Sequence, residues 1–87
     1  MVPQPNMSKL VSPNDMYDAA RKEMLDGNDV HSAEDAAKVM NFFAWNVEKG
    51  VAEAACLLIV RIYPELQMHL TDDDVKNIVA YQLARRA

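Results

Sequence analysis

The segment from Val51 to Tyr63 constrains the fold most strongly, because it is apolar at almost every position. On a helical wheel its two charged residues, Glu53 and Arg61, share one arc with Leu57 between them, and every other position is apolar. A helix that is apolar nearly all round must be buried nearly all round. The segment is too short and too charged to cross about 30 Å of hydrocarbon. We therefore expect a central helix that other helices cover on most sides.

Three capping patterns predict the helices that would cover this segment. Ser12, Ser32 and Thr71 each stand where an N-cap is expected, with carboxylates in the turn that follows. The predicted helices span about 12–25, 32–49 and 71–86. The side chains expected to face inward are Met16, Tyr17, Ala20 and Met24 on the first, Ala36, Met40, Phe43 and Val47 on the second, and Val75, Ile78, Val79 and Leu83 on the third.

Gly50 raises the question of whether the second helix continues into the apolar segment. Apolar positions 36, 40, 43 and 47 are in phase with 51, 54, 58 and 62, as a single helix would require. A glycine inside a helix costs roughly 1 kcal/mol, but it is well suited to the position after a helix end. We favour a break near Gly50. The alternative, one helix of about 30 residues, would need a second chain beside it.

The chain is predicted to form one all-α domain, a small compact bundle of three to five helices around residues 51–63. Its 87 residues are the length of a single domain. Residues 1–11 lack periodicity and contain Pro3 and Pro5, which favour extended backbone. We therefore expect an extended tail over 1–11 and the helical domain over 12–87.

The composition indicates the cellular compartment and the class of partner that the protein binds. Cys56 is the only cysteine, so no intrachain disulfide can form, and no signal-peptide pattern precedes Ser12. We therefore expect a cytoplasmic protein that does not enter a membrane. The formal net charge of −4 argues against nucleic acid as the main partner, since phosphate binding favours a basic face.

No catalytic, cofactor-binding or metal-binding pattern stands out, so we do not expect an enzyme. His31 and His69 lie in connecting segments without the spacing of metal ligands. The loop over 26–31 lacks the oxygen ligands and the glycine of a calcium-binding loop at the required positions. The three carboxylates at 72–74 point in different directions at a helix start, where capping explains them.

Phe42 and Trp45 provide the strongest functional signal. Both fall outside the inward stripe of the second helix and lie among polar and charged residues. Aromatic side chains within a charged rim are typical of protein-binding hot spots. The alternative is a wider core, in which the N-terminal tail or the last helix folds over both rings. The predicted partner-binding residues are Lys38, Asn41, Phe42, Trp45 and Lys49.

The function expected from these features is a non-enzymatic protein–protein interaction module, a small regulator, adaptor or inhibitor that docks on a larger protein. Three amphipathic helices of this size barely bury a fourth, so we also expect a homodimer. It would cover the spare face of residues 51–63 or the face with Phe42 and Trp45. A second hypothesis is a DNA-binding transcriptional regulator that uses the C-terminal helix, which ends in Arg85 and Arg86. A third is a small enzyme without a recognisable motif.

Overall fold

Side-chain caps begin the three helices that the sequence predicted. In the computed structural model, Ser12 Oγ and Ser32 Oγ each accept a hydrogen bond from the backbone N–H three residues later, at 3.2 and 3.1 Å. Thr71 and Asp74 cap reciprocally, because each side chain accepts a hydrogen bond from the other residue's backbone N–H. These bonds satisfy N–H groups that have no partner inside a helix. The predicted helix starts are therefore confirmed.

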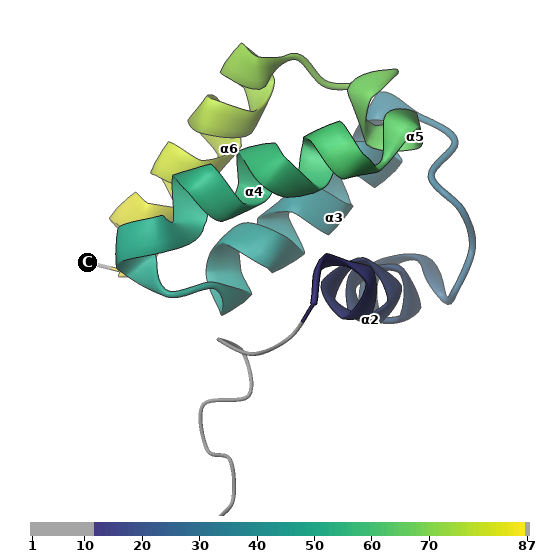
Figure 1. Ribbon diagram of the computed structural model, residues 1–87, viewed down its shortest axis with the longest axis horizontal. Helices are drawn as coiled ribbons and strands as arrows, with labels where there is room; N and C mark the ends of the chain where they lie inside the picture. The colour runs from purple at the N-terminus through teal and green to yellow at the C-terminus, as the bar shows by residue number, and fades with distance from the viewer. Residues whose placement is uncertain (1–11, 87) are drawn as a thin grey trace, which may run out of the picture.

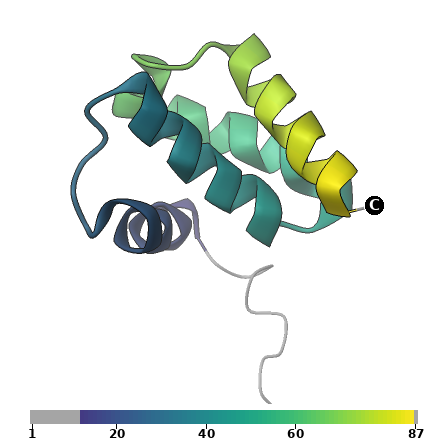
Figure 2. The ribbon, with the colours of Figure 1, turned by 180° about the vertical axis from the view of Figure 1, so that it is seen from behind.

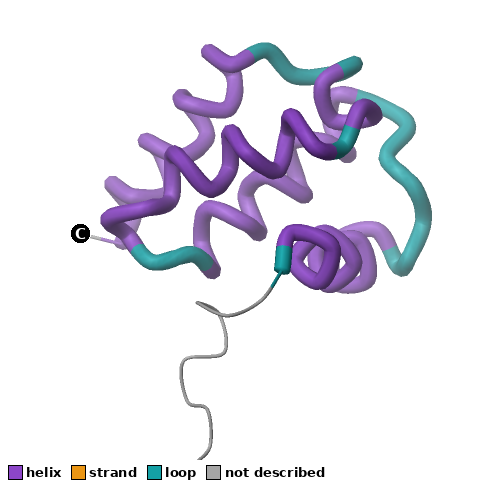
Figure 3. The backbone as a smooth tube through the Cα atoms, in the orientation of Figure 1, coloured by secondary structure: helices purple, strands orange, loops and turns teal. Residues whose placement is uncertain are grey.

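The structure describes residues 12–86, which form five α-helices and one 3₁₀ turn without any strand (Figures 1 and 3). The predicted all-α class is confirmed. The tail expected over 1–11 lies outside the described residues. Within 12–86, no helix has the length and apolarity needed to cross a bilayer. The elements are α2 (Pro13–Leu25), α3 (Ala33–Asn46), the 3₁₀ turn η1 (Lys49–Val51), α4 (Ala52–Ile62), α5 (Pro64–Gln67) and α6 (Asp72–Arg86).

The helix α3 packs against three neighbours, α2, α4 and α6, and is the most completely covered helix (Figures 1 and 2). The helices α2 and α6 lie on opposite flanks of α3, as Figure 2 shows, and α4 lies across α3 and α6. The core fills the space between these helices. Its largest fully buried side chains are Phe43, Met40, Ile59, Leu66, Val39, Val60, Val75, Val79 and Cys56.

The chain leaves the helical conformation before Gly50. Helix α3 ends at Asn46, Val47 is extended with φ −98° and ψ 147°, and Gly50 lies inside η1. The preferred prediction of a break between the two segments is confirmed. The break lets α4 fold back against α3. Positions 36, 40, 43 and 47 are buried whereas 51, 54, 58 and 62 are exposed, so their common phase does not mark one common face.

The expectation that residues 51–63 are buried nearly all round is wrong. Only one side of α4 is buried, the side that packs against α3 and α6. Val51, Leu58 and Ile62 remain 49%, 53% and 44% exposed. The physical reason is that α3 and α6 contact only part of the circumference of α4, while α2 packs on α3 instead.

Most of the other inward positions are confirmed, with one exception at the end of α2. Met24 is exposed and Leu25 is buried instead, because the loop that follows α2 folds back and buries Val30 beside it in the core. On α6, Val75 and Val79 are buried. The half-buried members of the predicted stripes are Met16, Ile78 and Leu83.

Candidate functional site

Three of the five predicted partner-binding residues are exposed. Trp45 is 50% exposed and is the large apolar side chain of α3 that solvent reaches most. Lys38 is also exposed, about two helical turns before Trp45. Its Nζ lies 3.9 Å from Glu34 Oε2, an ion pair typical of the solvated side of a helix. Lys49 is exposed in η1. An aromatic ring of α3 therefore stands in solvent, with exposed lysines seven residues before it and four residues after it.

Asn41 and Phe42 lie deeper than the other three. Phe42 is half-buried and packs against the core. Asn41 Oδ1 accepts a hydrogen bond from Gln82 Nε2 of α6 at 3.1 Å, so this amide joins two helices. The two hypotheses, a wider core and an exposed aromatic pair, therefore each describe one of the two residues. Phe42 is part of a wider core, and Trp45 remains exposed.

Arg86 at the end of α6 holds the surface around Trp45 in position. Its guanidinium lies over the indole, 5.4 Å from the ring centre. Its Nη1 donates to the Val47 carbonyl at 2.8 Å and its Nη2 donates to the Ala44 carbonyl. A helix end is where carbonyls lack intrahelical partners and where positive charge is favourable. The sequence places Arg86 at the end of its own helix but does not indicate these contacts, because the bonded residues are separated by 39 and 42 positions along the chain.

A second exposed apolar surface lies on α4. Figure 1 views the molecule from the side of α4, and Figure 2 views it from the side of α3. The side chains of this surface recur every three or four residues, which aligns them on one side of a helix. We call it the α4 stripe, and it consists of Val51, Ala54, Leu58 and Ile62.

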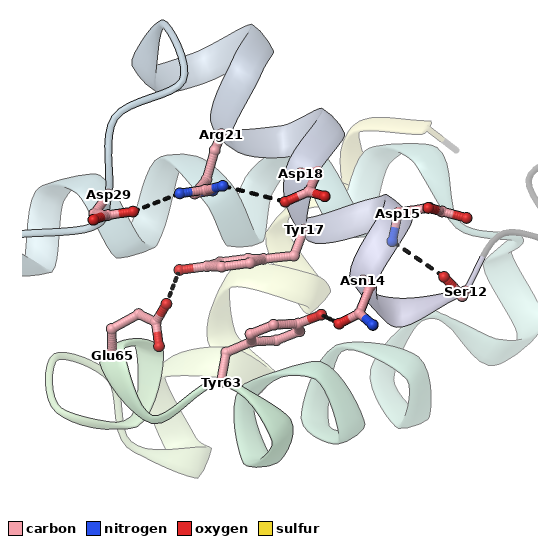
Figure 4. A network of polar contacts seen from close by, with 9 residues as sticks. All are labelled: Ser12, Asn14, Asp15, Tyr17, Asp18, Arg21, Asp29, Tyr63 and Glu65. Carbon is pink, nitrogen blue, oxygen red and sulfur yellow. Dashed lines mark hydrogen bonds and ion pairs between the residues drawn. The ribbon is translucent and has the colours of Figure 1, made fainter.

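A polar network joins α2 to the junction of α4 and α5 (Figure 4). The rings of Tyr17 and Tyr63 stack with their centres 4.1 Å apart. Tyr17 Oη donates a hydrogen bond to Glu65 Oε2 at 2.6 Å, and Tyr63 Oη donates one to Asn14 Oδ1. The partners are 48 and 49 positions apart, so no local sequence pattern indicates these contacts.

Burial and the neighbouring carboxylates raise the pKa of both phenols in this network. Burial raises the pKa of Tyr17 above its usual value, and the hydrogen bond to Glu65 raises it further. Burial also raises the pKa of Tyr63. Arg21 lies over the Tyr17 ring and pairs with Asp18 and Asp29, as Figure 4 shows. A phenol that holds its proton cannot serve as a base, so we interpret the network as the attachment of α2.

Cys56 is expected to be inert in the folded protein. Its side chain is fully buried, and burial raises the pKa of the thiol to about 12. Because the thiolate is the reactive form, its labelling by a disulfide reagent at neutral pH should be more than ~100-fold slower than in the unfolded chain. The absorbance of the released thiol measures both rates, with and without concentrated guanidinium. Fast labelling of the native protein would show that α4 leaves the core readily.

A hollow beside the α2–α3 loop gathers several ionisable side chains. A shallow hollow of about 350 Å³ beside the α2–α3 loop is lined by Asp29, His31, Asp35 and Lys38 among others. The Asp35 carboxylate already has a hydrogen-bond partner there, because its Oδ2 accepts a hydrogen bond from the His31 backbone N–H at 3.1 Å. Within residues 12–86, no three His, Cys, Asp or Glu side chains are arranged to hold a metal ion.

Comparison of the chain with protein-family models, with curated proteins and with solved structures gives no match. Two exposed apolar surfaces are therefore the candidate functional sites: the α4 stripe and the outward face of α3 around Trp45.

Proposed function

We propose that the protein is a non-enzymatic interaction module, a small regulator, adaptor or inhibitor that docks on a larger protein through the outward face of α3. The observation that supports this most is Trp45, an indole that is half exposed and yet held in place by Arg86. The docking surface consists of Lys38, Asn41, Phe42, Trp45 and Lys49. The proposal assigns this activity to the cytoplasm, where a lone cysteine stays reduced.

The restraint of Trp45 in the free protein lowers the free-energy cost of binding a partner. Tryptophan contributes a large apolar area and is enriched among the residues that carry most of the binding energy. Binding normally costs about 0.5–1.5 kcal/mol for each side chain that must be immobilised. Contact with Arg86 lowers that cost for Trp45 because the ring is already restricted. With Lys38 and Lys49 in the rim, the complementary surface is an apolar pocket with carboxylates at its edge.

Replacing Trp45 with alanine should remove partner binding while the fold persists. The free protein loses only an exposed cation–π contact, worth about 0.5–1 kcal/mol, so its helicity should be unchanged and its melting temperature slightly lower. Binding is measured by affinity capture from a lysate of the source organism, with wild type and variant as baits and quantitative mass spectrometry of the captured proteins. Proteins captured by wild type should be lost from the Trp45→Ala bait.

The matched control is Tyr81→Ala, which removes another largely exposed aromatic ring that is stacked on an arginine, but from α6. Its captured proteins should equal those of wild type. Because Trp45 is the only tryptophan, its fluorescence gives a direct second readout: emission should shift to shorter wavelength when a captured partner is added. Equal capture by the Trp45→Ala and wild-type baits would contradict the proposal.

The DNA-binding hypothesis receives less support from the charges of α6. The helix begins with three exposed aspartates at the end that a recognition helix presents to bases. Arg86 is bound to carbonyls of α3, and Arg85 lies over the Tyr81 ring. A DNA backbone would therefore meet few available cations on this helix.

A further inference from the structure

The α4 stripe contains a continuous apolar row. Ala54, Leu58 and Ile62 follow one another at four-residue spacing, which forms one of the ridges by which helices pack together. Val51 lies beside this row and is also about half exposed. Contiguous apolar patches on the surface of a small protein mark sites of association. The composition of this ridge and of its neighbour indicates what associates there.

The neighbouring ridge carries opposite charges at its two ends. It consists of Glu53, the half-buried Leu57 and Arg61, again at four-residue spacing. Arg61 Nη2 lies 3.1 Å from Asp72 Oδ2 in an exposed pair, which a second carboxylate can approach from solvent. Glu53 has no ion-pair partner among the residues that the structure describes. The ridge is therefore acidic at one end, basic at the other and apolar in the middle.

These two ridges are complementary to themselves when the helix direction is reversed. A two-fold axis near Leu57 brings Glu53 of one helix opposite Arg61 of the other, and the same ion pair then forms twice. With the same axis, Leu58 of one helix lies at the level between Ala54 and Leu58 of the other, so that a protruding side chain enters the space between two side chains of the facing row. In a parallel pair, a row on one edge of the helix would instead meet the opposite edge of its partner, and the charges would not meet.

We propose that α4 packs against α4 of a second copy of this chain in an antiparallel, two-fold symmetric dimer. Leu58 inserts between Ala54 and Leu58 of the partner subunit, and Glu53 pairs with Arg61 of the partner subunit. Ridges at four-residue spacing interlock at a crossing angle near 50° in magnitude. The inference goes beyond the proposed docking function and does not depend on it, because the α4 stripe shares no residue with the proposed docking surface.

The expected affinity follows from the size of the patch. A stable interface buries about 800 Å² on each partner, and one stripe of four side chains together with its charged edge supplies less than that. The dimer should therefore form with a dissociation constant in the micromolar range.

Sedimentation equilibrium of the full chain tests the dimer. The average mass should rise with concentration from 9.8 kDa towards twice that value. Leu58→Asp should weaken association roughly 30-fold or more, the effect of losing a hot-spot residue. Since Leu58 is half exposed, circular dichroism of this variant should match that of wild type. Trp45→Ala is the control and should dimerise like wild type.

A charge exchange tests the antiparallel arrangement. Glu53→Arg and Arg61→Glu should each weaken self-association, because each creates two like-charged contacts in its homodimer. An equimolar mixture of the two variants should dimerise again, since arginine at 53 then meets glutamate at 61 and the native pair forms on the other side. The change near Asp72 is the same in the mixture as in Arg61→Glu alone, so only contacts between copies explain the recovery.

Three outcomes would overturn the proposal. The first is a wild-type chain that remains a monomer at all concentrations, which would leave the stripe to a different protein or to another segment of this chain. The second is a dimer that Leu58→Asp leaves intact and Trp45→Ala abolishes. The third is a mixture of the two charge variants that associates no better than either variant alone.

Discussion

Phe43→Ala is expected to remove about 3–5 kcal/mol of folding free energy, a large share of the stability of a small domain. Phe43 is fully buried on α3, and its ring centre lies 6.4 Å from that of Tyr17 on α2. Because α3 touches α2, α4 and α6, a cavity in its buried face weakens the packing of the helix that contacts the most neighbours. Urea titration followed by circular dichroism measures the loss as a lower midpoint with a similar slope.

Phe42→Ala is the matched control, since it deletes the same atoms one residue earlier. Phe42 is half-buried at the edge of the core, so its loss should cost clearly less, about 1–2 kcal/mol. Equal losses from the two variants would mean that α3 presents a different face to the core.

Raising the pH above about 10 should destabilise the protein steeply. The pKa of Tyr17 is raised on folding, so above the usual tyrosine pKa of about 10 the unfolded chain loses a proton that the folded protein retains. Stability from such a group is fully present below that pH and is lost as the pH rises towards the folded pKa. The loss approaches roughly 1.4 kcal/mol per pH unit for one group, and Tyr63 adds to it in the same direction. Urea midpoints measured between neutral pH and pH ~11 follow the change.

Tyr17→Phe separates this effect from general alkaline denaturation. The variant loses the hydrogen bond to Glu65, so it should be less stable at neutral pH by about 1–2 kcal/mol. Its stability should then fall less steeply above pH ~10, because the ionisable group is gone. Tyr81→Phe, which changes a largely exposed ring, should keep the wild-type profile. Identical slopes for Tyr17→Phe and wild type would remove Tyr17 from the explanation.

Local features of the fold could be predicted from the sequence because their causes are local. The caps at Ser12, Ser32 and Thr71 act within one turn, and the inward stripe of α3 follows from helical spacing. The environment of α4 could not be predicted in the same way. Its apolar sequence indicated burial on all sides, but burial depends on how many neighbours reach a helix, and α3, α6 and the short α5 leave one side of α4 uncovered.

The candidate docking surface was predictable only in part. Helical phase separated Phe42 and Trp45 from the inward stripe, but it could not decide which ring the rest of the chain covers. That outcome depends on contacts between distant residues, such as Asn41 with Gln82 and Arg86 with the end of α3. The tyrosine network has the same character, since Tyr17 meets Glu65 only when α2 docks on the finished bundle.

The bonds of Arg86 to α3 also set the order in which the docking surface can be completed during synthesis. Trp45 leaves the ribosome about 40 residues before the arginine that restrains it. Until then the end of α3 lacks its cation, and the indole is free to rotate. A nascent or truncated chain that stops before residue 86 thus contains every residue of the proposed docking surface but lacks the restraint on Trp45, and we expect it to bind poorly. For the same reason, we expect a purification tag fused after α6 to disrupt binding more than one fused before α2.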